Sequence, residues 1–195
     1  IAMRDTDRDR VSHLVTRRRD GIETLAGLRG HALATGALDS PQATLIPLGL
    51  LHRHGLVPGR DVEVKRFDRL VGKHGDHIGG ELDAFRCLER GEAEACAMLD
   101  LNWQAWTRDG TIDPTRFGVL ASTGRFDHCV FTVRQELDAA AETRWLAALF
   151  AMRYDDPAHR EMMDLEGLKA WMPGRTTGFQ ALDEAVVATG FFSER

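Results

Sequence analysis

The segment "GKHGDHIGGE", residues 72–81, concentrates four side chains that can bind a metal ion, namely His74, Asp76, His77 and Glu81. Imidazole and carboxylate groups suit zinc or another transition metal. The i, i+4 spacing of His77 and Glu81 places both side chains on one face of a helix. The surrounding glycines leave His74 and Asp76 without a fixed direction, so the segment is compatible with a metal site, a metal-free loop that contacts a ligand, or a solvated surface loop. We predict the second, with His77 and Glu81 as ligand contacts, and keep the metal site as the alternative.

A second group of polar residues stands where an apolar run turns into an amphipathic one, in "ALDSPQATLIP". Ser40 is a favourable helix N-cap, and Pro41 suits the first helical position because it has no N–H to leave unpaired. The N-terminus of such a helix offers free N–H donors and positive dipole charge. We therefore predict that Ser40 and Gln42 contact a ligand, with a plain capped helix as the alternative.

Further polar residues stand next to strand-like apolar segments. Asp100 and Asn102 follow "EACAML", and Asp127 and His128 precede "CVFTVR". The carboxyl ends of parallel strands line the ligand crevice in open α/β sheets. We therefore predict that Asp100 and Asn102 contact the same ligand as the Ser40 segment. Asp127 and His128 stand just before a second strand that joins two lobes, where a hinged cleft would open, and we predict that they contact this ligand too.

The elements that must position these residues alternate between strand and helix. This order predicts an α/β fold with a mainly parallel sheet flanked by helices. From Gln135 onward the pattern predicts helices only. The expected strands are residues 11–17, 31–37, 61–67, 94–99, 117–123 and 128–134. The expected helices are a short one within residues 20–30, the segment after Ser40, and residues 81–91, 101–110, 137–153, 165–171 and 179–192.

Two similar strands, residues 11–17 and 128–134, bracket the α/β block. We therefore expect residues 20–127 to form a complete α/β lobe, with residues 1–19 and 128–195 forming hinge strands and the helical remainder of another lobe. A helical tail without strands of its own needs a sheet to cover, so we expect the N-terminal part of that lobe to lie upstream of Ile1.

Composition narrows the possible functions. The net charge of −5 comes from 25 basic and 30 acidic residues that are mixed along the chain, and 43% of the residues are hydrophobic. This pattern predicts no nucleic-acid partner, and no apolar run reaches the length of a membrane span. Cys87, Cys96 and Cys129 lie in apolar runs, which predicts buried free thiols. No Walker loop, dinucleotide motif or nucleophile elbow is present, so we expect neither a cofactor nor an enzyme.

Three short motifs carry a resemblance to a known family. They are "LAGLRG" at residues 25–30, "GLVPGRD" at residues 55–61 and "GEAEA" at residues 91–95. Their order and spacing, with a similar C-terminal segment "LEGLKAWMPGRTTGFQALDEAVVATGFF", resemble the phosphonate/phosphate-type substrate-binding proteins of ABC transporters. The resemblance covers most of the chain from about Asp20 onward.

This resemblance implies a type 2 periplasmic-binding-protein fold, in which two lobes joined by two crossing strands close over a small ligand. It implies an ABC-transporter permease as partner and a periplasmic or cell-envelope location, although the sequence shows no signal peptide. It also implies that the opening βαβ units of the first lobe are absent from this chain.

The ligand is expected to differ from the best-known one of the family. Only Ser40 keeps a hydroxyl in the loop where the family supplies several, and Pro41 has lost an N–H donor. Glu81 aligns with a histidine that binds the ligand in the family, and its carboxylate would repel a phosphonate dianion. A ligand carrying a cation, or a neutral polar one, fits these residues better.

Two other functions are compatible with the same fold. One is an enzyme of the chorismate-dehydratase-like or pyrimidine-synthase-like kind, with the "HGDH" cluster as its chemical centre. The other is the effector-sensing domain of a regulator, for which a DNA-binding segment would precede Ile1.

Overall fold

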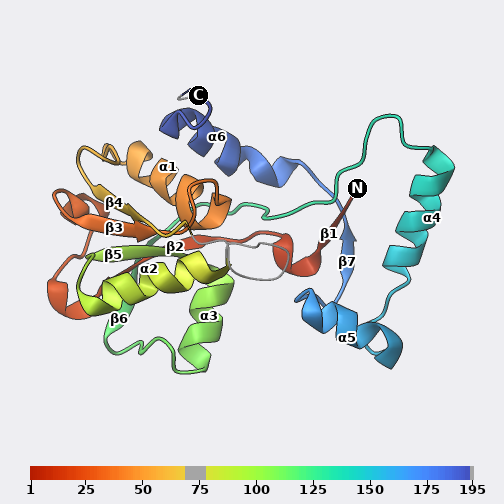
Figure 1. Cartoon of the computed structure of the whole chain (residues 1–195), viewed down its shortest axis with the longest axis horizontal. Helices are drawn as coiled ribbons and strands as arrows, with labels where there is room; N and C mark the ends of the chain where they lie inside the picture. The colour runs from red at the N-terminus through yellow and green to blue at the C-terminus, as the bar shows by residue number, and fades with distance from the viewer. Residues whose placement is uncertain (69–77, 194–195) are drawn as a thin grey trace. The chain divides into compact units, whose positions relative to one another are not determined.

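The computed structural model describes residues 1–68 and 78–193 (Figure 1). It divides the chain into two compact units. The larger unit comprises Val11–Gly124 and Ala181–Arg195, and the smaller unit comprises Ile1–Arg10 and Arg125–Gln180. The chain therefore passes between the units at three points, and the C-terminal helix returns to the larger unit. The expected division of the whole protein at residues 20 and 127 stays a prediction.

The larger unit is built on a five-stranded sheet with the strand order β4-β3-β5-β2-β6. Strand β3 is parallel to β4 and β5, whereas β2 is antiparallel to β5 and β6. Four strands therefore run in one direction and β2 runs against them, which confirms the α/β alternation predicted from the sequence. The strands are β2 (Ser12–Arg17), β3 (Ala32–Thr35), β4 (Glu63–Arg66), β5 (Ala95–Leu99) and β6 (Phe117–Ser122).

Helices cover both faces of this sheet: α1 (Ile46–Arg53) lies on one side, and α2 (Ile78–Arg90) and α3 (Asp100–Arg108) lie on the other (Figure 1). Successive residues of β2 pack into the hydrophobic clusters on the two faces of the sheet. Leu14 packs with the leucines of α1, and Val15 packs with Phe85 of α2. Period-2 alternation in a strand sends successive side chains to opposite faces. Burial on both faces explains why the central strands β3 and β5 read as apolar runs.

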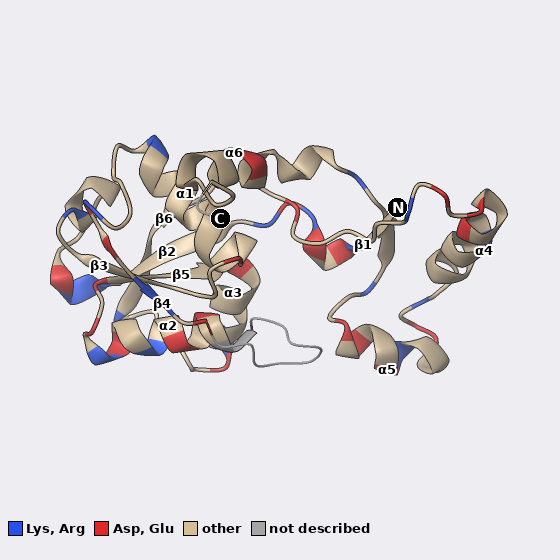
Figure 2. Ribbon diagram, turned by 45° about the horizontal axis from the view of Figure 1, so that its top comes forward, with Lys and Arg blue, Asp and Glu red and all other residues tan. Residues whose placement is uncertain are grey.

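Glycine residues with positive φ follow two of the helices. Gly55 follows the end of α1 with φ +73°, and Gly91 follows α2 with φ +79°. A residue with a Cβ is strained at such positive φ values, so glycine is the favoured residue just after a helix. On the surface of α2, Arg86 pairs with Glu89 at 2.6 Å. Figure 2 shows basic and acidic residues interspersed along this helix, in line with the mixed charge of the sequence.

The C-terminal helix α6 (Gln180–Thr189) packs on α1 through two small residues. A Cβ added at Gly49 would lie 2.8 Å from the Cβ of Ala185. Both residues are buried. The absence of a side chain at Gly49 therefore sets how closely the two helices approach.

The smaller unit contains a two-stranded antiparallel sheet of β1 (Ala2–Arg4) and β7 (Trp171–Pro173). Its helices are α4 (Ala139–Phe150) and α5 (Pro157–Leu165). They begin at Asp138 and Asp156, whose carboxylates accept hydrogen bonds from backbone N–H groups of the first turn, as N-caps do.

Several short helices complete the two units. Among the residues that the structure describes, no helix is long and apolar enough to cross a membrane. The short helices are η1 (Asp5–Asp7), η2 (Arg18–Asp20), η3 (Leu25–Leu28) and η6 (Thr177–Phe179), together with a π-helical turn, η4 (Pro41–Leu45).

Three expectations about the tail are wrong. Residues 128–134 form no strand, because Phe131 makes only an isolated bridge with Ala2. The tail is not purely helical, since β7 pairs with the N-terminal strand. The segment 165–171 is not a helix: Gly167 has φ +68°, which ends α5, and Trp171 begins β7. In each case the tail pairs with the first few residues of the chain. Local periodicity does not predict such distant pairing.

Candidate ligand-binding site

Polar residues gather at one edge of the five-stranded sheet. Strands β5 and β6 end at Leu99 and Ser122, whereas β2 begins at Ser12 because it runs antiparallel to both. Ser12 is the register partner of Leu99, and His13 is the partner of Ser122. The carboxyl end of β3 and the helices that follow β3 and β5 lie at this same edge. We call it the carboxyl edge; open α/β sheets place their ligand sites here.

The Ser40 loop at this edge is an N-cap, as predicted. The Ser40 hydroxyl accepts a hydrogen bond from the Ala43 N–H at 3.2 Å. The Ser40 carbonyl accepts from the N–H groups of Thr44 and Leu45 at 3.1 and 3.0 Å. Ser40 is fully buried, and Pro41 has no N–H. The backbone N–H donors of this turn therefore bond within the turn, whereas an anion-binding loop leaves such donors for the ligand.

Gln42 joins this loop to the start of β2. Its carbonyl accepts from the Ser12 hydroxyl at 2.6 Å. Within the described part of the chain, Gln42 Oε1 and the hydroxyls of Thr35 and Thr44 are buried without a hydrogen-bond partner. Buried polar atoms are normally paired, so three such atoms near one turn mark a place where a partner is missing.

Glu81 and Asn102, both predicted as ligand contacts, are brought together by the fold. Glu81 Oε2 accepts from Asn102 Nδ2 at 2.7 Å and from the Leu99 N–H at 2.9 Å. Glu81 is 2% exposed. Its carboxylate therefore ties α2 to the junction between β5 and α3. Two N–H donors partly neutralise the charge of the Glu81 carboxylate. Glu81 therefore repels an anionic ligand less than a carboxylate without such donors would.

Asp100 begins α3 and lies beside His13, a residue that the sequence did not single out. The Asp100 N–H donates to the Val11 carbonyl at 2.9 Å. His13 Nδ1 lies 2.9 Å from the Ser122 hydroxyl, and its ring meets Trp103 edge-on with centroids 6.4 Å apart. Burial lowers the pKa of His13, although the charge of Asp100 opposes this shift. The carboxyl edge thus presents a neutral imidazole next to a carboxylate and an aromatic ring.

In the smaller unit, Asp127 forms a buried ion pair with Arg175. Arg175 Nε lies 2.6 Å from Asp127 Oδ2, and a second guanidinium nitrogen lies 2.7 Å from Oδ1. The same nitrogen contacts Asp9 at 2.9 Å. The hydrogen bonds from Arg175 lower the pKa of Asp127, whose side chain is fully buried. Sequence reasoning missed Arg175, because nothing in "MPGRTTG" marks it as the partner of a residue 48 positions earlier.

His128 points to Asp7 and Cys129. Its Nδ1 lies 3.2 Å from Asp7 Oδ1 and 3.1 Å from Cys129 Sγ. Burial lowers the pKa of His128, but the hydrogen bonds and charges of Asp7 and Cys129 outweigh it and raise this pKa to about 9. Cys129 is exposed, so the prediction of a buried thiol is wrong here, although Cys87 and Cys96 are buried as expected.

The metal-site hypothesis for the "HGDH" loop stays a prediction. His74, Asp76 and His77 lie outside the described residues, and only Glu81 of that set is described. The ligand-contact prediction for His77 stays open for the same reason.

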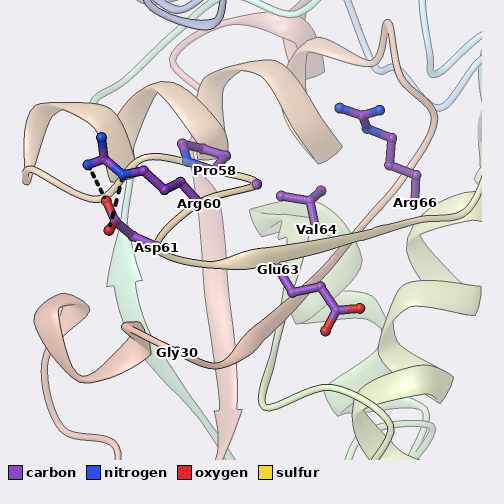
Figure 3. Close-up of a pocket in the computed structure, with 8 residues that line it drawn as sticks. Gly30, Pro58, Arg60, Asp61, Glu63, Val64 and Arg66 are labelled. Carbon is purple, nitrogen blue, oxygen red and sulfur yellow. Dashed lines mark hydrogen bonds and ion pairs between the residues drawn. The ribbon is translucent and has the colours of Figure 1, made fainter.

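A hollow of about 530 Å³ lies elsewhere on the larger unit, around the turn at residues 58–61 that leads into β4 (Figure 3). There the Arg60 side chain bends back to Asp61, and Arg66 lies apart from this pair. Hydrogen bonding to Arg60 and to the Val57 N–H lowers the pKa of Asp61 to about 2. The Asp61 carboxylate is bonded within its own turn, and this turn stands before β4 and not at the carboxyl end of a strand. We therefore do not assign ligand binding to this hollow.

Comparison with solved structures defines the class of fold. The Xanthomonas citri protein XAC2383, solved with bound ATP, has a TM-score of 0.75 at 20% identity, covering 99% of this chain and 70% of that one. PhnD1 from Prochlorococcus marinus in complex with methylphosphonate also gives 0.75, at 14% identity over 97% and 70% of the two chains. The fold is that of the type 2 periplasmic binding proteins.

Sequence comparison gives the family. The model of the family described as "ABC transporter, phosphonate, periplasmic substrate-binding protein" matches residues 1–185, and the chain belongs to this family. An uncharacterized protein of Haemophilus influenzae is 63% identical over 27 residues, which are 14% of this chain and 38% of that protein. The chain thus matches little more than a third of the length of this relative.

Proposed function

We propose that this protein is the solute-binding component of an ABC-type uptake system, acts in the periplasm or cell envelope and hands a small polar ligand to a permease. Membership of the family supports the transport role. The observation that carries the site is the convergence of polar side chains at the carboxyl edge. In this proposal Gln42, Asp100 and Asn102 contact the ligand directly, and Ser40 and Glu81 hold the loop and the α3 N-terminus in place.

We further propose that Asp127 and His128 contact the ligand when two hinged lobes close over it. The contribution of His77 rests on its place in the sequence beside Glu81. Turnover of the ligand is not part of this function, because a transport protein releases its ligand unchanged.

The chemistry of the carboxyl edge favours a neutral or cationic ligand group over a phosphonate dianion. The Ser40 turn keeps three N–H groups for its own carbonyl and hydroxyl oxygens. Asp100 adds negative charge where an anion would need donors, and the Trp103 ring nearby suits a cation or an apolar ligand face. A compound that joins a cationic ring to a polar tail meets these conditions.

Isothermal titration calorimetry against a matched panel tests this proposal. The panel contains methylphosphonate, inorganic phosphate, ATP, arginine and thiamine, each titrated into the full chain, and mass spectrometry checks that the bound compound is recovered intact. We expect one cationic or neutral compound to bind with a dissociation constant in the micromolar range or tighter, and both simple phosphorus anions to bind at least 100-fold more weakly.

Variants then locate the site. Gln42→Ala and Asp100→Asn should each weaken binding of the best compound about tenfold or more, which corresponds to about 1.4 kcal/mol. Gln104→Ala, an exposed position on the same helix α3, is the matched control and should bind like the unaltered protein. Equal affinity in all three variants would refute the site, whereas preferential binding of methylphosphonate would refute the ligand class alone.

A further inference from the structure

Three potential metal ligands of different chemistry meet in the smaller unit. They are a carboxylate oxygen of Asp7, the Nδ1 of His128 and the Sγ of Cys129, and all three atoms lie within 4.8 Å of one another. Asp7 and Cys129 are 122 positions apart in the sequence, so the fold has to bring them together. The backbone helps, because the His128 N–H donates to the Asp7 carbonyl at 2.8 Å.

We propose that Asp7, His128 and Cys129 form a site for one thiophilic divalent cation, with Zn²⁺ or Co²⁺ as the fitting ions. Oxygen, imidazole nitrogen and thiolate sulfur are the three ligand types that zinc takes in proteins. With ordinary zinc bond lengths, tetrahedral geometry places the nitrogen about 3.4 Å from the oxygen and about 3.6 Å from the sulfur. The observed distances are 3.2 and 3.1 Å. These two pairs therefore need to move apart by at most about 0.5 Å to admit the ion. The third pair, the Asp7 oxygen and the Cys129 sulfur, lies within 4.8 Å and would be about 3.6 Å apart around the ion.

The charges of the ligands and the hydrogen bonds that orient Asp7 agree with a site for a divalent cation. A carboxylate and a thiolate together balance the charge of a divalent ion. Arg4 donates to both oxygens of Asp7, at 2.8 and 2.9 Å, and anchors itself on the Glu166 carbonyl at 2.9 Å. Carboxylates that bind metals are commonly oriented by such outer hydrogen bonds. Arg4 thus holds Asp7 with one oxygen toward His128, although its positive charge limits the affinity for the cation.

The three ligands differ in their exposure to solvent. Asp7 is 3% exposed, whereas the His128 side chain is 22% exposed and Cys129 is open to solvent. An ion can therefore enter from the Cys129 side and find a rigid carboxylate at the inner end. Three protein ligands leave a fourth tetrahedral position, which a water molecule would fill from the solvent side.

Titration of the chelator-treated full chain with Co²⁺ tests the site. A thiolate ligand to Co²⁺ produces a charge-transfer absorption band in the near ultraviolet, and we expect it to saturate at one equivalent and to disappear when Zn²⁺ is added. Cys129→Ser should abolish the band. Asp7→Asn and His128→Gln should weaken Co²⁺ binding by at least the 10- to 100-fold that loss of an outer-shell partner alone costs.

Two controls make the test specific. His159→Gln removes another partly exposed histidine of the smaller unit, which lies 3.6 Å from Asp156, and should leave the band unchanged. The double variant His74→Gln, His77→Gln addresses the rival loop and should also keep the band. Circular dichroism verifies folding of each variant. The assignment is overturned if the unaltered chain shows no band, if the band survives Cys129→Ser, or if it is lost only in the double variant.

Discussion

Replacing Gly49 by alanine separates two opposing effects at the contact between α1 and α6. Gly49 lies inside α1, where alanine is favoured over glycine by about 0.8–1.0 kcal/mol. The new Cβ would lie 2.8 Å from the Cβ and 3.0 Å from the Cα of Ala185. Ordinary carbon contacts are about 3.5–4.0 Å, so α6 must move away by roughly 0.5–1 Å.

Overpacking of this kind costs about 1–3 kcal/mol, which exceeds the gain in helix propensity. We therefore expect Gly49→Ala to lower the free energy of unfolding by about 1 kcal/mol. The loss should be concentrated in α6, because the rest of α1 keeps its packing against the sheet. Urea denaturation gives the total, and amide hydrogen exchange should show α6 opening several-fold more often.

The double variant with Ala185→Gly is the decisive control. Removal of the Ala185 methyl group takes away the 2.8 Å contact and leaves the 3.0 Å contact with the Cα of residue 185. In the Ala185→Gly background, Gly49→Ala should therefore be less destabilising by about 1 kcal/mol than in the unaltered protein. An equal loss of stability in both backgrounds would show that the contact with the Ala185 methyl group does not determine the outcome.

Three further predictions concern buried contacts. Arg175 lowers the pKa of Asp127, so this carboxylate stabilises the fold above its ordinary pKa of 3.8, and the stabilisation is lost as the pH falls through the lower folded value. Arg175→Ala should therefore move the midpoint of acid unfolding, followed by circular dichroism, to higher pH. Gly178→Ala should reduce the thermal stability of the smaller unit in calorimetry, because its Cβ would lie 2.1 Å from the Asp127 carboxylate. Phe117→Ala should cost about 3–5 kcal/mol in urea denaturation, since this buried ring packs edge-on against Phe85 at 5.0 Å.

Each of these variants has a matched control. Arg153 pairs with Asp155 at 2.6 Å, but both side chains are about 70% exposed, so Arg153→Ala should leave the acid midpoint unchanged. A Cβ at Gly124 meets no atom within 4 Å, and Gly124→Ala should be tolerated. Val119 is exposed on the same strand as Phe117, and Val119→Ala should have little effect. If a variant and its control behave alike, burial is not the cause of the effect.

The local elements of the larger unit were readable from the sequence because each carries its own periodicity. The predicted strand at residues 11–17 is β2, and the predicted helix at residues 81–91 is α2 within a few residues. Ser40 as a cap and Gly91 as a stop were predictable for the same reason. These features depend on neighbours at most four positions away, and the three family motifs are equally local.

The site combined local and distant information. That Asp100 and Asn102 follow a strand could be read directly, and so could the position of Gln42 after a cap. The sequence did not show that Asn102 donates to Glu81 or that His13 lies beside Asp100. The neighbourhood of His13 and Asp100 depends on the antiparallel insertion of β2 between β5 and β6, which alternation alone does not specify. The contact of Asn102 with Glu81 depends on how α2 packs beside the junction of β5 and α3.

In the smaller unit, only the tertiary structure determined the important contacts. Asp127 pairs with Arg175, His128 pairs with Asp7, and Cys129 is exposed although Val130 and Phe131 follow it. Helix and strand patterns report which face of an element is buried, but not which distant segment covers that face. Charged partners far apart in sequence leave no periodic trace. The sequence therefore established the class of protein and the elements of its sheet, while the return of the chain to its first ten residues decided which side chains meet.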